Sequence, residues 1–139
     1  MDKYSPAELK KIHSIGQQML SNSYSPYSEF SVASVAISTT GEFFGGTNIE
    51  NTSYSLTVCA EVCAIANMVA SGKTALKDIF IFSCNDKFVT PCGACRQVIL
   101  EFSQSDINVN LVTQDNQIRT HKLSSLIPHA FHLNEEQEA

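Results

Sequence analysis

The sequence predicts an α/β sandwich that contains at least one parallel pair of strands. Segments of strand character alternate with segments of helical spacing, and 43% of the 139 residues are hydrophobic. A chain of this length and composition can bury one core. We therefore expect a single domain over residues 1–139, with a frayed acidic tail over residues 134–139.

The first part of the chain is expected to form a helix and a hairpin. Residues 5–8, with the sequence SPAE, combine a capping box with proline at the first helical position, and apolar residues continue at helical spacing to Leu20. Valine, isoleucine and small residues favour a strand over residues 30–38. A turn at residues 39–41 leads into a second strand over residues 42–47.

The rest of the chain alternates helix and strand. Residues 58–71 have the spacing of a helix, and Gly72 provides its end. The later elements are expected to be strands over residues 79–82, 107–112 and 117–120, and helices over residues 93–102 and 123–127.

Charge and hydropathy narrow the range of partners. The net charge is −5, from 9 basic and 14 acidic residues, and the basic residues are scattered along the chain. Nucleic-acid binders usually carry a basic patch, so we expect a small-molecule substrate and no nucleic acid. No apolar run reaches the roughly 18 residues that span a membrane, and the first residues lack a signal-peptide pattern. We expect a cytoplasmic protein without a membrane partner.

Three of the five cysteines lie where helices are expected to begin. An odd cysteine count argues against a disulfide framework, and in a reducing compartment such spacing favours metal binding. A helix start lowers the pKa of a thiol, which primes Cys59, Cys92 and Cys95 to bind metal as thiolates. If the two helix starts converge, three sulfurs leave zinc one open position, as in catalytic sites. Glu61 beside that position can move protons for an activated water.

The spacing alone leaves other interpretations open. Each cysteine can be a small buried residue, and Cys92 and Cys95 can form a redox couple. Alternatively, Cys63 can join Cys59, Cys92 and Cys95 in a closed zinc site that stabilises a non-enzymatic interaction domain. That four-cysteine site would make Glu61 an ordinary surface residue.

Five segments occur together in a recognisable order, and they are residues 25–32, residues 48–51 (NIEN), Tyr54, residues 59–61 (CAE) and residues 91–97 (PCGACRQ). They closely resemble the cytidine deaminase family, in its short-chain homotetrameric branch, over nearly the whole chain. The PCxxC segment is shared by the wider deaminase superfamily, whereas NIEN is more specific to nucleoside deaminases. The resemblance implies a three-layer α/β/α sandwich with a mixed five-stranded sheet, and a homotetramer.

The resemblance also implies an activity and a metal centre. It implies zinc-dependent hydrolytic deamination of cytidine and 2′-deoxycytidine in pyrimidine salvage. One zinc ion per chain is expected on Cys59, Cys92 and Cys95, with Glu61 as the catalytic proton shuttle. A deaminase of a modified cytosine nucleoside, of the blasticidin type, is the alternative enzyme, but that type lacks the NIEN segment.

The same resemblance assigns the nucleoside substrate to four residues. Asn48 and Glu50 are expected to hydrogen-bond the ribose 3′-hydroxyl, and Phe30 to pack near the base. Phe131 resembles a C-terminal phenylalanine that reaches a neighbouring subunit's site.

One residue beside the metal motif departs from the family. Val62 stands where the family usually has an arginine that offsets the negative charge of the zinc thiolates. Valine has no hydrogen-bond donor, so we expect the helix starts and Arg96 to offset this charge instead. Cys63, at a position commonly occupied by threonine or a small residue, is expected to be a packing residue.

Overall fold

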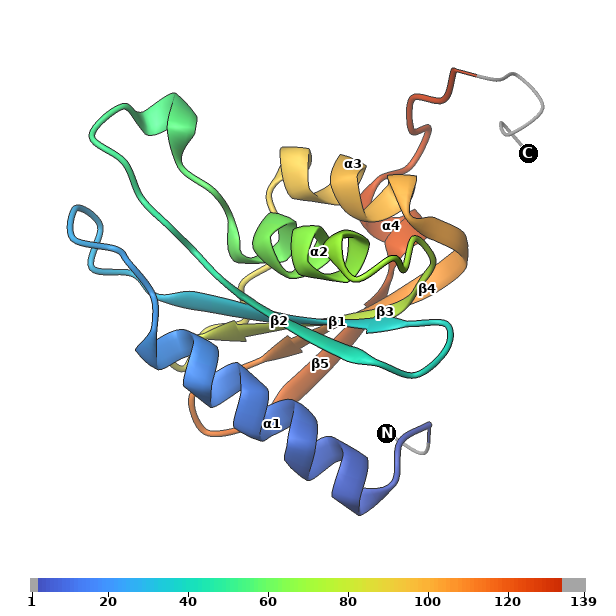
Figure 1. Cartoon of the computed structure of the whole chain (residues 1–139), viewed down its shortest axis with the longest axis horizontal. Helices are drawn as coiled ribbons and strands as arrows, with labels where there is room; N and C mark the ends of the chain where they lie inside the picture. Colours follow the sequence, from blue (N-terminus) through green and yellow to red (C-terminus); the bar gives the residue numbers. More distant parts are fainter. Residues whose placement is uncertain (1–2, 134–139) are drawn as a thin grey trace.

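The computed structural model describes residues 3–133 and alternates strands with helices, as the sequence predicts (Figure 1). The acidic tail expected over residues 134–139 lies outside the described residues. The helices are α1 (Pro6–Ser21), α2 (Ala60–Ala70), α3 (Gly93–Glu101), α4 (Leu123–Leu126) and the 3-10 turn η1 (Tyr54–Leu56). The strands are β1 (Val32–Ser38), β2 (Phe43–Thr47), β3 (Leu76–Ser83), β4 (Ser103–Val112) and β5 (Ile118–Lys122).

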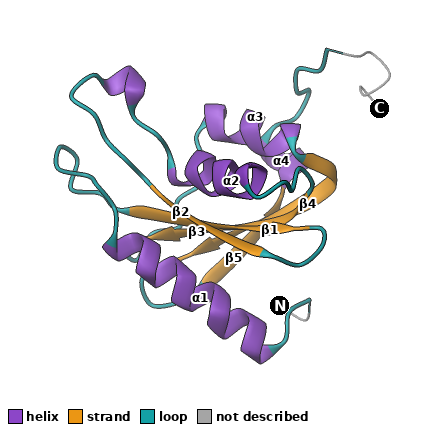
Figure 2. Cartoon of the chain, in the orientation of Figure 1, coloured by secondary structure: helices purple, strands orange, loops and turns teal. Residues whose placement is uncertain are grey.

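The five strands form one mixed sheet in the order β2-β1-β3-β4-β5. Strands β3 and β4 are parallel, and the other neighbours are antiparallel. Helix α1 covers one face of the sheet, and α2, α3 and α4 lie on the other face (Figure 2). The predicted three-layer α/β/α sandwich is thus confirmed.

Strand β3 supplies apolar side chains to both faces of the sheet. Phe80 and Phe82 point into the cluster beneath α1, whereas Ile79 and Ile81 point into the cluster beneath the other helices. Successive side chains of a strand alternate between faces, so a strand covered on both sides needs a continuous apolar run. The central position of β3 follows from this pattern.

Strand β3 begins at Leu76, three residues before the expected start, because a buried charge interrupts its apolar pattern. Asp78 has no exposed surface, but Tyr4 donates a hydrogen bond to its carboxylate and Lys3 Nζ lies 2.9 Å from Asp78 Oδ2. A buried charge is tolerated when it is paired and hydrogen-bonded. The residues before α1 therefore stabilise the start of β3.

Strand β1 begins at Val32, two residues later than expected, because side chains bind the backbone of Phe30. Asn48 Nδ2 donates to the Phe30 carbonyl at 2.8 Å, and the Phe30 N–H donates to Ser28 Oγ at 3.1 Å. No helix in residues 3–133 combines the length and the apolarity that a membrane crossing requires.

Candidate metal centre

The segments that carry the expected site residues meet at one edge of the sheet. Thr47 at the end of β2, Ala33 in β1 and Phe82 in β3 are neighbours in one row across these strands. The chain therefore leaves β2 toward Asn48, enters β1 from Phe30 and leaves β3 toward α3, all at this edge.

A short backbone pairing then brings the NIEN segment beside the first cysteine of the site. Ile49 and Val58 form an antiparallel bridge, with an N–H to carbonyl distance of 2.9 Å in each direction. Val58 directly precedes Cys59, and Ile49 lies between Asn48 and Glu50. The residues expected to bind ribose are therefore held next to the start of α2.

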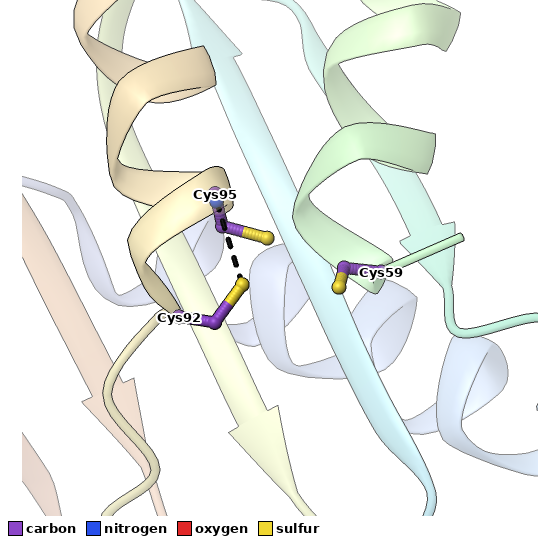
Figure 3. Close-up of side chains that lie close together, drawn as sticks. All are labelled: Cys59, Cys92 and Cys95. Carbon is purple, nitrogen blue, oxygen red and sulfur yellow. Dashed lines mark hydrogen bonds between the residues drawn. The ribbon is translucent and has the colours of Figure 1, made fainter. Parts of the chain in front are cut away.

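The three expected cysteines converge, as the sequence predicts. Cys59 is the N-cap residue of α2 and Cys92 is the N-cap residue of α3, while Cys95 lies in the first turn of α3. Their sulfur atoms all lie within 4.8 Å of one another, in the space between the two helix starts (Figure 3). Cys63 is absent from this group, so among the described residues the alternative of a closed four-cysteine site is wrong.

The pKa values of the three thiols differ from one another. Burial opposes ionisation of Cys92, but the Cys95 N–H, 3.5 Å from Cys92 Sγ, and the thiols of Cys95 and Cys59 hold its pKa below the ordinary value. Burial raises the pKa of Cys59, and burial with the negative charge of Glu61 raises the pKa of Cys95. The prediction that the helix starts lower all three values is therefore wrong for Cys59 and Cys95, because burial and mutual repulsion outweigh the helix dipole.

This clustering of acidic groups fits a bound cation. Three thiols and the carboxyl group of Glu61 share one partly buried region, and each raises the energy of ionising its neighbours. A divalent cation reverses this preference and stabilises the thiolates. Sulfur is a preferred zinc ligand at about 2.3 Å, so this donor set suits zinc with a fourth position open.

Glu61 lies in the first turn of α2 and is only 5% exposed. Burial raises the pKa of its carboxyl group, although its own backbone N–H and the Cys95 thiol donate hydrogen bonds that act in the opposite direction. A carboxyl group whose pKa moves toward neutrality can both accept and release protons. Its position beside the sulfurs is that of a proton carrier for a reaction at the metal's open position.

The arginine expected to offset the thiolate charge is used elsewhere. Arg96 Nε donates to the Pro91 carbonyl at 2.7 Å, and Arg96 Nη1 donates to the Leu126 carbonyl at 2.6 Å. These bonds tie the start of α3 to α4, so the expectation that Arg96 offsets the sulfur charge is wrong. Val62 is a half-buried residue of α2 and has no donor to offer. The backbone N–H groups at the helix starts remain to perform this role.

Asn48 is largely buried and is bound to the loop that precedes β1. Its Oδ1 accepts hydrogen bonds from Val32 N–H at 3.0 Å and from the Ser23 hydroxyl, and its Nδ2 donates to Phe30. Both acceptor sites are thus used, but the amide group retains one N–H for a ligand. Asn48 therefore positions Phe30 and can still offer a donor.

Glu50 is held by the same loop. Its Oε1 accepts from Tyr27 N–H at 3.0 Å and Ser28 N–H at 3.1 Å, and its Oε2 accepts from the Ser28 hydroxyl. The Ser28 hydroxyl bond, followed by the backbone bonds, keeps the pKa of Glu50 below its ordinary value. Ser28 also binds the Phe30 N–H, so one side chain connects two expected substrate residues. The sequence analysis missed Ser28, although it stands within the recognised segment of residues 25–32.

The two expected aromatic contacts differ in placement. Phe30 is half-buried at the edge of the sheet that carries the cysteines. Phe131 is 69% exposed, and its carbonyl accepts a hydrogen bond from Gln97 Nε2 at 3.4 Å. Within one chain Phe131 therefore does not pack into the metal centre, and its contact with a neighbouring subunit stays a prediction.

Comparison with known proteins identifies the same family as the motifs. The family model for the cytidine and deoxycytidylate deaminase zinc-binding region matches residues 6–111. A cytidine deaminase of Mycoplasma genitalium is 37% identical over 116 residues, which are 83% of this chain and 88% of that protein.

Solved structures agree with the sequence comparison. The crystal structure of a cytidine deaminase from Burkholderia pseudomallei superposes with a TM-score of 0.81 at 31% identity, over 88% of this chain and 98% of that one. A cytidine deaminase structure from Mycobacterium tuberculosis gives 0.77 at 31% identity, over 90% and 98%.

Proposed function

The chain belongs to the cytidine and deoxycytidylate deaminase family, and from this premise we propose that it deaminates cytidine and 2′-deoxycytidine to uridine, 2′-deoxyuridine and ammonia. The observation that carries the proposal is the convergence of three sulfurs beside one buried carboxyl group. Zinc bound by Cys59, Cys92 and Cys95 supplies an activated water as the nucleophile.

Glu61 is the general acid and base of this reaction. It takes one proton from the attacking water and delivers that proton to N3 of the cytosine ring, while the water oxygen adds to C4. Glu61 then transfers the second proton to the amino group, which leaves as ammonia. The raised pKa of the buried carboxyl group suits a residue that accepts and donates protons in turn.

The loop residues are proposed to hold the sugar and the base. Asn48 retains one amide N–H and Glu50 retains acceptor capacity on Oε2, which is a suitable pair for the ribose 3′-hydroxyl. Phe30 packs against the base. The charge of Glu50 would repel a phosphate on the 3′ oxygen, so the substrate is a free nucleoside and not a polynucleotide.

The proposal includes one catalytic domain over residues 1–139, a homotetramer and a place in pyrimidine salvage in the cytoplasm. Exposed apolar side chains support subunit contacts, among them Tyr54 at 78%, Leu56 at 63% and Phe131 at 69%. Phe131 is assigned to a neighbouring subunit's site. All five cysteines are free thiols, which supports a reducing compartment.

An ultraviolet assay of cytosine absorbance tests the function. The zinc-loaded wild type is expected to consume cytidine, and Glu61→Gln to bind zinc but lose at least about 10²–10⁴-fold in turnover, because glutamine cannot carry protons. Glu101→Gln, on an exposed glutamate at the end of α3, is the matched control. Near-normal turnover by Glu61→Gln would exclude the assigned role. A wild type that ignores cytidine but deaminates a modified cytosine nucleoside would support the blasticidin-type alternative.

A further inference from the structure

Strand β2 lies between two helices and contains two consecutive glycines. Successive residues of a strand face opposite sides of the sheet, so Gly45 and Gly46 face different helices. A Cβ atom at Gly45 would meet the side chains of Ile15 and Met19 on α1, both at 2.9 Å. A Cβ atom at Gly46 would meet α2.

The contact at Gly46 is unusual because it is with backbone. A Cβ atom there would lie 2.2 Å from Ala64 N, 2.5 Å from Ala60 O and 2.8 Å from Ala64 Cα. Side-chain ends can rotate away from a new methyl group, but helix backbone can only move as a unit. Gly46 is also buried and paired with Ser34 of β1, so the strand itself cannot retreat freely.

The helix that rests on Gly46 is the one that carries half of the metal centre. Ala60 lies between Cys59, the sulfur donor at the start of α2, and Glu61, the buried carboxyl group. The other two sulfurs belong to α3, whose contacts are with α2 and α4 and not with β2. A displacement of α2 away from β2 therefore changes the distance between Cys59 and the sulfurs of Cys92 and Cys95.

We propose that Gly46 is a positioning residue for the metal centre: its missing side chain sets the height of α2 above the sheet and thereby the distance of Cys59 from the two sulfurs of α3. The inference deepens the proposed function and rests on it. Restoring an ordinary contact from 2.2 Å would move the helix by about 1 Å. Metal–ligand distances tolerate only about 0.2 Å, so this displacement is large enough to disturb zinc binding.

Gly46→Ala tests the proposal, and Gly45→Ala is the matched control on the opposite face. Both variants add one methyl group to the same strand, and both are expected to lower Tm by overpacking. Zinc release to a chromogenic chelator and the sulfur-to-cobalt absorption of the Co²⁺-exchanged protein report on the metal centre independently of turnover. Gly46→Ala is expected to weaken zinc binding about 10–100-fold and to change the cobalt spectrum. Gly45→Ala is expected to keep both properties of the wild type.

A second variant keeps the test decisive if Gly46→Ala does not fold. Ala64→Ser adds one atom to the buried face of α2 near the same contact and is expected to produce the same two metal signatures to a smaller extent. The proposal is overturned if the folded variants lose stability but match Gly45→Ala in zinc release and cobalt spectrum. That outcome would leave the proposed function intact if the wild type still deaminates cytidine, whereas a wild type that binds no zinc would refute the proposed function itself.

Discussion

Replacing Ser28 with alanine is expected to weaken nucleoside binding and to leave the chemical step nearly unchanged. The Ser28 hydroxyl donates to Glu50 and accepts from Phe30 N–H at 3.1 Å, so its loss frees both proposed substrate contacts together. Neither bond involves Glu61 or a cysteine. The variant should therefore raise KM for cytidine with little change in kcat.

The size of the effect follows from the bonds that remain. Glu50 keeps two backbone donors, Tyr27 N–H at 3.0 Å and Ser28 N–H at 3.1 Å, and loses only the hydroxyl. The loss of one hydrogen bond to a charged group predicts a KM increase of about 10-fold. A loss of 100-fold or more would require Glu50 to leave the loop altogether.

The pH dependence of binding supplies a second measure. The Ser28 hydroxyl is the main reason that the pKa of Glu50 lies below its ordinary value, so Ser28→Ala should raise this pKa. A carboxylate with a lowered pKa keeps its charge down to lower pH. In the variant, binding of cytidine should therefore begin to weaken at a higher pH than in the wild type as the solution is acidified.

Steady-state kinetics with cytidine and 3′-deoxycytidine separate the possible causes. If Glu50 binds the 3′-hydroxyl, the contribution of Ser28 through Glu50 disappears for 3′-deoxycytidine, and the KM ratio of variant to wild type should fall toward one. Ser28→Thr retains a hydroxyl group and should restore most of the binding.

A serine elsewhere in the chain provides a matched control. Ser124 binds Asp106 through its N–H at 2.9 Å and its hydroxyl at 2.7 Å, the same arrangement that joins Ser28 to Glu50. Asp106 lies toward the start of β4, away from Val112 at the site edge, so Ser124→Ala should leave KM unchanged. The reasoning is refuted if Ser28→Ala lowers kcat at constant KM, or raises KM equally for both nucleosides.

Three further predictions concern the metal, the assembly and stability. Zinc analysis should show loss of metal in Cys59→Ala and about one zinc per chain in Cys63→Ala, and the reverse result would show that the ligands are wrongly assigned. A homotetramer should lose activity on dilution and in Phe131→Ala, whereas a fully active monomer in sedimentation would contradict the subunit contact. Burial and the hydrogen bond to Asp78 raise the pKa of Tyr4 above its ordinary value of 10.0, so its stabilising contribution is present below pH 10 and declines as the pH rises further. Tyr4→Phe should cost about 1.5–3 kcal/mol near neutral pH, and its melting temperature should lack this alkaline decline relative to the wild type.

The local elements could be predicted from the sequence because their signals are local. The Ser5–Glu8 capping box was confirmed, and so was Gly72 after α2, where the backbone adopts a positive φ of 91°. Cys59 and Cys92 were likewise expected at helix starts and are the N-cap residues of α2 and α3. Such signals depend on backbone sterics and on hydrogen bonds within a few residues. Asp78 shows the limit, because its tolerance in β3 depends on Tyr4, 74 residues away.

The sequence by itself determined the metal-binding residue types, the helix starts and the family, since each of these is written in adjacent residues. Only the tertiary structure decided that Cys63 lies outside the sulfur cluster, that Arg96 binds carbonyl groups, and that burial raises the pKa of Cys95. It also revealed that Ser28 connects Glu50 to Phe30 across 22 residues of sequence and that α2 rests on Gly46. The physical reason is that burial, charge repulsion and close packing arise between segments that are distant along the chain, and no local pattern specifies the distance between them.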